Sequence, residues 1–294
     1  RIGGDFRVQE MKYNYKSEES LESKNALLVM QGDIYANLDI NEKASIYYKT
    51  GINTEYSKPE FWTMVNFLED NILYFKIGRG LPNFGFRIDD HTAFIRGGNH
   101  KIKYGFNKEG MVFNPMSNIP GIFEIGFYQG YNTFITGSIA NSYINGSAVY
   151  GKEKFKNKNL ALKINYNISL FNKWNLTITP SIMSEGNIKL KSAAFGASNQ
   201  MFTWLYEIDR ADNWVLENIK SEAVYHELEF DISSGIQLIG KYDFFDPDID
   251  VKDGAIHRYT IGVEIFPFNM MGIMILGRKT FLDKINLIPE PELI

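Results

Sequence analysis

The chain has 294 residues and a net charge of −4, and 44% of its residues are hydrophobic, 15% aromatic and none cysteine. This composition excludes intrinsic disorder, and the lack of cysteine excludes a disulfide framework, a Cys-ligated zinc site and a thiol nucleophile. With 31 basic against 35 acidic residues and no basic block, nucleic acid is not an expected partner.

Apolar and polar residues alternate with a period of two along much of the chain. Between residues 26 and 40 every even position is apolar or glycine, whereas Asp33 and Asp39 occupy odd positions. Residues 160–169 and 235–244 repeat this pattern, which is that of a β-strand with two different faces. Helical spacing is not sustained, and no apolar run approaches the roughly 18 residues of a membrane-spanning helix. The sequence therefore predicts an all-β fold.

Fifteen strands can be read between the breakers. In chain order they are 4–15, 25–40, 43–54, 60–68, 71–80, 121–129, 132–142, 158–169, 174–184, 190–198, 201–210, 218–231, 235–245, 257–266 and 270–279. Most have nine or more residues, as a tilted membrane-crossing strand requires, whereas strands of globular domains usually have about 5–6.

The connections between these strands alternate in length. Every second connection is short, namely 41–42, 69–70, 130–131, 171–173, 199–200, 233–234 and 267–269. The others are mostly longer and more polar, namely 16–24, 55–59, 81–120, 143–157, 185–189, 211–217 and 246–256. Short turns at one rim and long loops at the other are typical of an outer-membrane β-barrel, so residues 1–294 are expected to form one antiparallel transmembrane barrel domain.

A barrel also accounts for the aromatic residues, which gather near strand ends. One group lies at the short turns: Tyr131, Phe134, Phe171, Trp174, Phe266 and Phe268. A second lies toward the long loops: Phe61, Trp62, Trp204, Tyr206, Tyr242, Phe244 and Phe245. Two such belts match the aromatic girdles at the two lipid–water interfaces, although aromatic residues also favour strands in general.

The strand count is odd, whereas single-chain bacterial barrels have an even number of strands. The tail 280–294 has two prolines and little alternation, so it is expected to be a final loop or tail rather than a strand. We therefore expect a sixteen-stranded plan whose last strand lies beyond Ile294 or is supplied in some other way.

Residues for catalysis or cofactor binding are scarce. The four histidines, His91, His100, His226 and His257, show no metal-ligand spacing, and no nucleophile elbow, P-loop or dinucleotide fingerprint occurs. The sequence predicts no enzyme, no metal and no cofactor.

Along the strands every second residue is mostly polar, and the side chains of these residues are expected to face the lumen. We call the two alternating sets of strand positions the two parities of the strand. The polar parity carries charges of both signs, which suits a water-filled pore: Asp33, Lys49, Lys76, Glu124, Lys163, Glu207, Glu227, Glu229, Lys241, Asp243, Arg258 and Glu264. For most of them we favour the interpretation that they only keep the lumen hydrated.

The connection 81–120 is long and has a composition of its own, which is typical of functional loops. Its charged residues either fold inward as a constriction or pair with one another outside the barrel. Together with the strand residues, the predicted pore-lining or constriction set is Lys49, Lys76, Arg79, Arg87, Asp89, Asp90, His91, Arg96, Lys163, Glu207, Lys241 and Arg258.

Two segments resemble a known family. Residues 74–85, YFKIGRGLPNFG, are similar to the strand-to-loop signature of the phosphate-selective porin O/P family, and residues 241–248 with 258–267 look like its penultimate region. The resemblance implies a sixteen-stranded, trimeric porin of the bacterial outer membrane, which passes small solutes through a loop-constricted pore.

The expected function is thus passive diffusion of small hydrophilic solutes or ions, with outer-membrane lipid and further copies of the chain as partners. An alternative is a barrel that anchors or sheathes a larger envelope assembly, such as an electron-transfer conduit or a secretion machine. A soluble β-sandwich lectin is a third reading, which recovery only in detergent would exclude.

Overall fold

The computed structural model describes most of the strand residues and parts of the long connections. The described residues are 1–16, 21–51, 59–68, 72–86, 93–96, 103–104, 108–109, 119–130, 132–141, 158–171, 173–214, 217–268 and 270–282.

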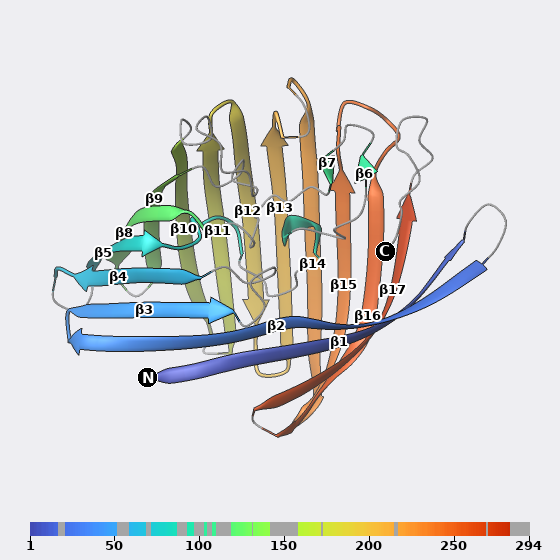
Figure 1. The fold of residues 1–294 in the computed structure, drawn as a ribbon, viewed down its shortest axis with the longest axis horizontal. Helices are drawn as coiled ribbons and strands as arrows, with labels where there is room; N and C mark the ends of the chain where they lie inside the picture. Colours follow the sequence, from blue (N-terminus) through green and yellow to red (C-terminus); the bar gives the residue numbers. More distant parts are fainter. Residues whose placement is uncertain are drawn as a thin grey trace.

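Fifteen strands form one antiparallel sheet in which each strand pairs with its neighbours in sequence (Figure 1). They are β1 (Ile2–Lys16), β2 (Leu21–Asn41), β3 (Ala44–Gly51), β4 (Glu60–Asn66), β5 (Leu73–Arg79), β8 (Gly121–Gln129), β9 (Thr133–Asn141), β10 (Lys158–Leu170), β11 (Trp174–Glu185), β12 (Ile188–Ser198), β13 (Phe202–Asp212), β14 (Lys220–Ser233), β15 (Ile236–Asp246), β16 (Ile256–Phe268) and β17 (Met271–Leu282). This order confirms the all-β prediction and its fifteen strands.

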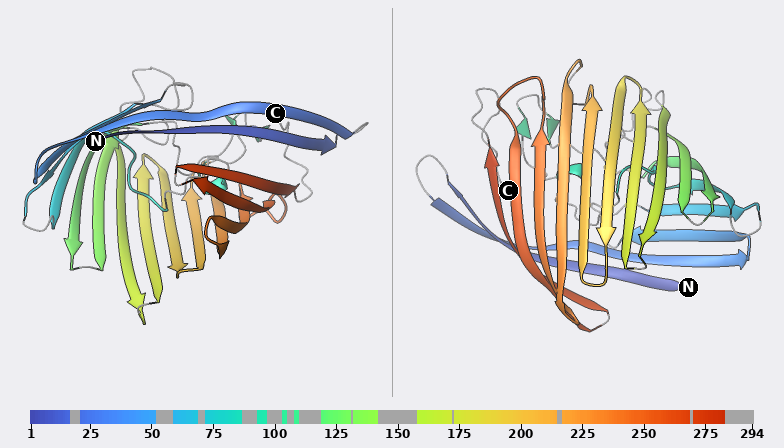
Figure 2. Two further views of the ribbon diagram at one scale, coloured as in Figure 1. Left: turned by 90° about the horizontal axis from the view of Figure 1, so that it is seen from below. Right: turned by 180° about the vertical axis from the view of Figure 1, so that it is seen from behind.

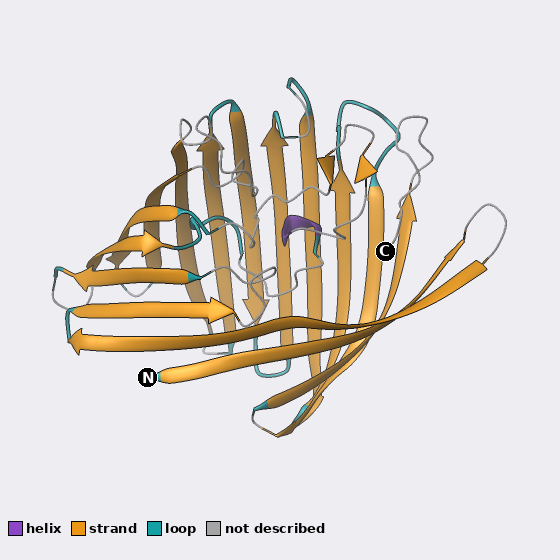
Figure 3. Ribbon diagram, in the orientation of Figure 1, coloured by secondary structure: helices purple, strands orange, loops and turns teal. Residues whose placement is uncertain are grey.

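Small elements lie within the connection 81–120. β6 (Lys103–Tyr104) and β7 (Lys108–Glu109) form a two-stranded antiparallel sheet, and η2 (Phe94–Arg96) is a single helical turn (Figure 3). The sequence did not predict these elements. Among the described residues, no helix is long and apolar enough to cross a membrane.

Two predicted connections and the predicted tail are shorter in the structure. β1 and β2 pair as far as Lys16 and Leu21, because backbone pairing carries the strands through a polar stretch without apolar alternation. β11 and β12 are joined by Gly186 and Asn187 alone, and Gly186 has the positive φ of +63° that tight hairpin turns favour. β17 continues to Leu282, so residues 280–282 of the predicted tail are strand, and residues 283–294 lie outside the described part.

The sheet curls strongly, and in Figure 1 β1–β5 run across the direction of β10–β17. Seen from below (Figure 2, left), it wraps around an inner space. Such coiling follows from the right-handed twist that each strand adds. Within the described residues β1 and β17 are the edges of the sheet. Because all pairings are antiparallel, these edge strands run in the same direction, and the sixteenth strand stays a prediction.

The two faces of the sheet differ as the alternation predicts. On β10, Leu160 and Leu162 are exposed on the convex face, whereas Asn159 and Ala161 are buried on the concave face. The same division recurs on β11, where Ile182 is exposed and Met183 buried. The convex face is therefore the apolar, lipid-type face.

The predicted aromatic belts need correction at Phe134 and at two adjacent pairs. Phe134 has the strand parity of the buried residues Thr136 and Ser138, and its ring stacks on that of the buried Tyr74 with centroids 6.0 Å apart, so it faces the concave side. Phe245 is only 1% exposed on the concave face, and the Lys76 ammonium lies 5.7 Å from the ring centroid of Trp62, which places Trp62 on that face too. Because successive strand residues point to opposite faces, Phe61 with Trp62 and Phe244 with Phe245 cannot both face outward. Tyr131 lies outside the described residues.

The hydrophobic core lies on the concave side. The connection after β5 turns inward, and Phe84, Ile95 and Ile119 are buried against Leu190 and Tyr225 of the sheet. The η2 turn contacts β14 and β15. Part of the long connection thus covers the inner face of the sheet.

Candidate functional site

The candidate site is the charged concave face together with the inner segment, defined here as residues 81–86 and 93–96. On the side of β2–β8, Lys49 pairs with Asp33 at 2.9 Å and Lys76 with Glu124 at 2.8 Å. The Tyr74 hydroxyl also donates to Glu124 Oε1 at 2.7 Å. Both carboxylates are almost fully buried, while their lysines keep part of their side chains exposed. These two pairs form what we call the open bank.

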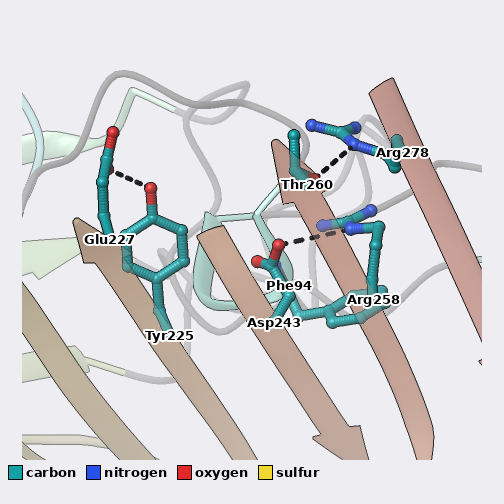
Figure 4. A network of polar contacts seen from close by, with 7 residues as sticks. All are labelled: Phe94, Tyr225, Glu227, Asp243, Arg258, Thr260 and Arg278. Carbon is teal, nitrogen blue, oxygen red and sulfur yellow. Dashed lines mark hydrogen bonds and ion pairs between the residues drawn. The ribbon is translucent and has the colours of Figure 1, made fainter. Parts of the chain in front are cut away.

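A second set of charge pairs lies on β14–β16, and Figure 4 shows one of them, Asp243 with Arg258. Lys241 Nζ lies 3.1 Å from Glu227 Oε1, and Arg258 Nε lies 3.3 Å from Asp243 Oδ2. All four side chains are at least nine-tenths buried. We call these two pairs the covered bank.

Further hydroxyl groups complete the network of the covered bank. The Tyr225 hydroxyl donates to Glu227, and Arg278 Nε donates to Thr260 Oγ1 at 3.1 Å. Hydrogen bonding of this kind compensates for removing the charges from water.

The inner segment is fastened first at Gly85. The Gly85 N–H donates to Ser181 Oγ at 2.9 Å, the Phe86 N–H donates to Glu207 Oε2 at 2.7 Å, and Lys163 Nζ donates to the Gly85 carbonyl at 2.7 Å. Three strands, β10, β11 and β13, therefore bind one turn of the backbone.

Only glycine fits at this turn. Gly85 has a φ of +55°, and a Cβ placed on it would overlap Glu207 Oε1. The absent side chain lets the backbone reach the buried carboxylate directly.

The second fastening point lies at η2. The Phe94 N–H donates to Asp243 Oδ1 at 3.1 Å, and the Arg258 guanidinium lies 4.2 Å from the Phe94 ring centroid. Phe94 also packs against Phe245, with the ring centroids 6.0 Å apart. The ion pair of the covered bank thus holds η2 through a hydrogen bond and a cation–π contact.

The two ends of the connection are joined at the strand ends. Arg79 donates to the Ile119 carbonyl from Nε at 3.3 Å and from Nη2 at 3.2 Å, and the Gly80 N–H donates to the Pro120 carbonyl at 3.1 Å. Arg79 has the outward parity of the exposed residue Ile77. It therefore braces the base of the connection.

Arg79 was predicted to line the pore, but it has the outward parity and binds the Ile119 carbonyl instead. The other eleven predicted site residues fall into three groups. Lys49 and Lys76 are partly exposed on the open bank, whereas Lys163, Glu207, Lys241 and Arg258 bind the inner segment or lie buried with the pairs that hold it. A third group lies outside the described residues: Arg87, Asp89, Asp90 and His91, together with the side chain of Arg96.

Several contributors to the site were not in the predicted set. Gly85, Ser181 and Phe94 act through a backbone carbonyl, a hydroxyl or backbone N–H groups, and no sequence pattern signals such partners. Asp243 was expected to face the lumen but was not included in the predicted set. Its position opposite Arg258 on the neighbouring strand could have indicated that it belongs to the site.

The chemistry of this face is electrostatic. Within the described ranges no cluster of three or more His, Asp or Glu residues is arranged to hold a metal ion. The two described histidines have the outward strand parity and so lie on the other, convex face, where the His226 ring centroid is 4.6 Å from that of Tyr206 and His257 Nδ1 is 3.0 Å from the Tyr242 hydroxyl. The arrangement offers fixed charges and dipoles to a passing solute.

No protein-family model matches the chain, and no curated protein matches its sequence. Solved structures do match its fold. The anion-selective porin from Comamonas acidovorans is 9% identical with a TM-score of 0.63, covering 96% of this chain and 90% of that one. Salmonella typhi OmpF, in a complex with daunomycin, is 12% identical with a TM-score of 0.61, covering 97% and 91%.

The trimer form of OmpT, an outer membrane protein of Vibrio cholerae, is 10% identical with a TM-score of 0.55, covering 95% of this chain and 88% of that one. At these identities the likeness concerns the fold. The sheet of this chain has the architecture of the porin barrels.

Proposed function

We propose that this chain is a porin of the bacterial outer membrane, a passive channel for small hydrophilic solutes or ions, with residues 1–294 as one barrel domain. The observation that carries this proposal is the inner segment fastened to a charged concave face, inside a sheet whose convex face is apolar. The fold likeness to porins supports it.

In the proposed mechanism, hydrated solutes cross down their gradient along the concave face. The inner segment narrows the passage, and exposed charges bias which ions enter. Lys49 and Lys76 contribute from the open bank because their side chains are partly exposed. We assign Arg87, Asp89, Asp90, His91 and Arg96 to the rim of the narrowing as a prediction. No covalent step is needed.

Solute preference and assembly belong to the same proposal. Charges of both signs on the described concave face favour a general diffusion pore over a phosphate-selective one. Membership of the O/P porin family stays a prediction from the sequence. A trimer is proposed, and the trimeric form of the Vibrio cholerae protein supports it.

Single-channel recording in planar bilayers tests the proposal. Stable open steps after insertion of the purified protein are expected. A barrel that inserts from detergent but stays electrically silent, and that co-purifies with envelope proteins, would instead favour the sheath of a larger assembly.

A further inference from the structure

The convex face of β8–β12 carries an apolar groove of about 550 Å³. Its walls come from two neighbouring rows of residues that are paired across the strands. One row runs Phe123, Ile139, Leu160, Ser184, and the next runs Ile125, Gly137, Leu162, Ile182. A volume of this size lies within the range of roughly 300–1,000 Å³ that is usual for small-ligand sites.

Gly137 opens the floor of this groove. It lies between Ile125 on β8 and Leu162 on β10. A Cβ on Gly137 would find its nearest neighbour, Ile125 Cγ2, at 3.7 Å, which is ordinary contact distance. The groove therefore exists because this position has no side chain, and a larger residue would fill it without a backbone clash.

On β12 each of the two rows ends at a lysine. Lys189 pairs with Ser184 and Lys191 with Ile182, so both lie on the outward parity of β12 and line the groove. They follow the turn at Gly186 and Asn187, which belongs to the long-loop rim. Both are exposed.

Two other cationic side chains of the convex face have a charged or aromatic partner, whereas these two lysines have no ion pair within the described part of the chain. Their neighbour Arg210 binds Glu222 at 2.6 Å. A second groove, on β14–β17, has its outward-facing lysine, Lys279, placed 4.7 Å from the ring centroid of Phe281. The groove of β8–β12 thus presents, above an aliphatic floor, two lysines without an ion pair among the described residues, with Asp212 the cross-strand neighbour of Lys189.

We propose that this groove binds a phosphate-bearing lipid of the leaflet at the long-loop rim. An acyl chain lies along Leu160, Leu162 and Gly137, and the lipid phosphate lies between Lys189 and Lys191. Basic side chains at the headgroup level attract lipid phosphates, while a cation on a lipid-facing parity is unfavourable without an anion. The inference rests on the membrane placement in the proposed function.

Native mass spectrometry of the detergent-solubilised protein tests this site, with dioleoylphosphatidylglycerol and dioleoylphosphatidylcholine as probes. The wild-type protein is expected to retain the anionic phosphatidylglycerol in preference to the zwitterionic phosphatidylcholine, because the choline ammonium repels the two lysines. K189Q/K191Q is expected to weaken that retention roughly twenty-five-fold, at about five-fold for each lysine. Gly137→Leu is expected to weaken retention of both lipids, because it fills the groove.

Lys173→Gln is the matched control, since Lys173 is an exposed lysine in a turn of the short-turn rim. Retention by K189Q/K191Q equal to that of the wild type and of Lys173→Gln would overturn the inference. Planar-bilayer conductance of the same variants separates the two proposals, because the groove lies outside the lumen. Lysine-dependent retention in a silent barrel would support the lipid site while contradicting the porin.

Discussion

The open bank and the covered bank are built from the same residue types at the same strand parity, yet they have different surroundings. Lys49 and Lys76 have side chains 25% and 14% exposed, whereas Lys241 and Arg258 have side chains 5% and 2% exposed. The difference lies in what covers them, since η2 packs over the covered bank. A charged residue that points inward from a barrel strand can therefore do one of two things. Where the inner segment covers it, it binds the segment, and where nothing covers it, it faces the solute.

The largest effect is expected from Asp243→Ala in the covered bank. This change leaves the buried Arg258 without its carboxylate and removes the acceptor of the Phe94 N–H. Breaking a buried pair typically costs about 3–5 kcal/mol of the free energy of unfolding, which urea denaturation in detergent measures. Arg210→Ala, at the exposed pair with Glu222, is the control and should cost about 0–1 kcal/mol. Equal losses would remove the distinction between covered and exposed pairs.

Both banks lie on the concave face only if the apolar face of each strand is the outer one. Leu162→Arg tests this assignment of the two faces. Leu162 lies on the apolar convex face of β10, where a cation near midspan should cost about 2–4 kcal/mol of folding free energy in a bilayer. Leu162→Met is the matched control and should be nearly neutral. If urea titration in vesicles finds the arginine harmless, the two faces are assigned backwards.

Gly85→Ala tests how the segment is fastened, and Gly130→Ala supplies its control. Both glycines have positive φ, +55° and +62°, but a Cβ on Gly130 meets nothing within 4 Å, whereas one on Gly85 overlaps Glu207. Both variants lose about 1–2 kcal/mol of folding free energy to backbone strain. Gly85→Ala should lose a further 1.5–3 kcal/mol or so, because Glu207 must release the Phe86 N–H.

Gly85→Ala should also raise single-channel conductance, since the segment leaves the concave face. Identical conductance and stability for the two alanine variants would mean that the Glu207 contact does not hold the segment.

The smallest effect is expected from Lys76→Gln in the open bank, where the glutamine amide can still donate to the buried Glu124, and it should appear in ion selectivity. The change leaves the Glu124 carboxylate without its ammonium partner near the solute path, so the zero-current potential in a KCl gradient should move toward potassium. Lys173→Gln, in a turn of the short-turn rim, should leave that potential unchanged. An equal shift from both variants would discard the role of the open bank.

The sequence predicted the strands well because their alternation is a local property. The parity of β10, with Leu162 outward and Lys163 inward, can be read from neighbouring residues alone. The belt assignment failed where aromatic residues were counted by their nearness to strand ends without regard to parity, as at Trp62, Phe134 and Phe245.

The fastening of the segment could not be read in this way. It depends on the Phe86 N–H donating to Glu207, a contact between positions more than 100 residues apart that involves a backbone group present in nearly every residue. Arg258 was predicted to line the pore, yet Phe94 covers it, and no local pattern indicates which loop residue will pack over which strand charge.

The most direct test of the central claim is a liposome-swelling assay with uncharged sugars of increasing size. The account predicts that vesicles containing the purified protein swell fastest in pentoses and progressively more slowly in disaccharides and trisaccharides. Gly85→Ala should lessen this dependence on size, because it releases the segment. Vesicles that swell no faster than protein-free controls would contradict a passive diffusion channel.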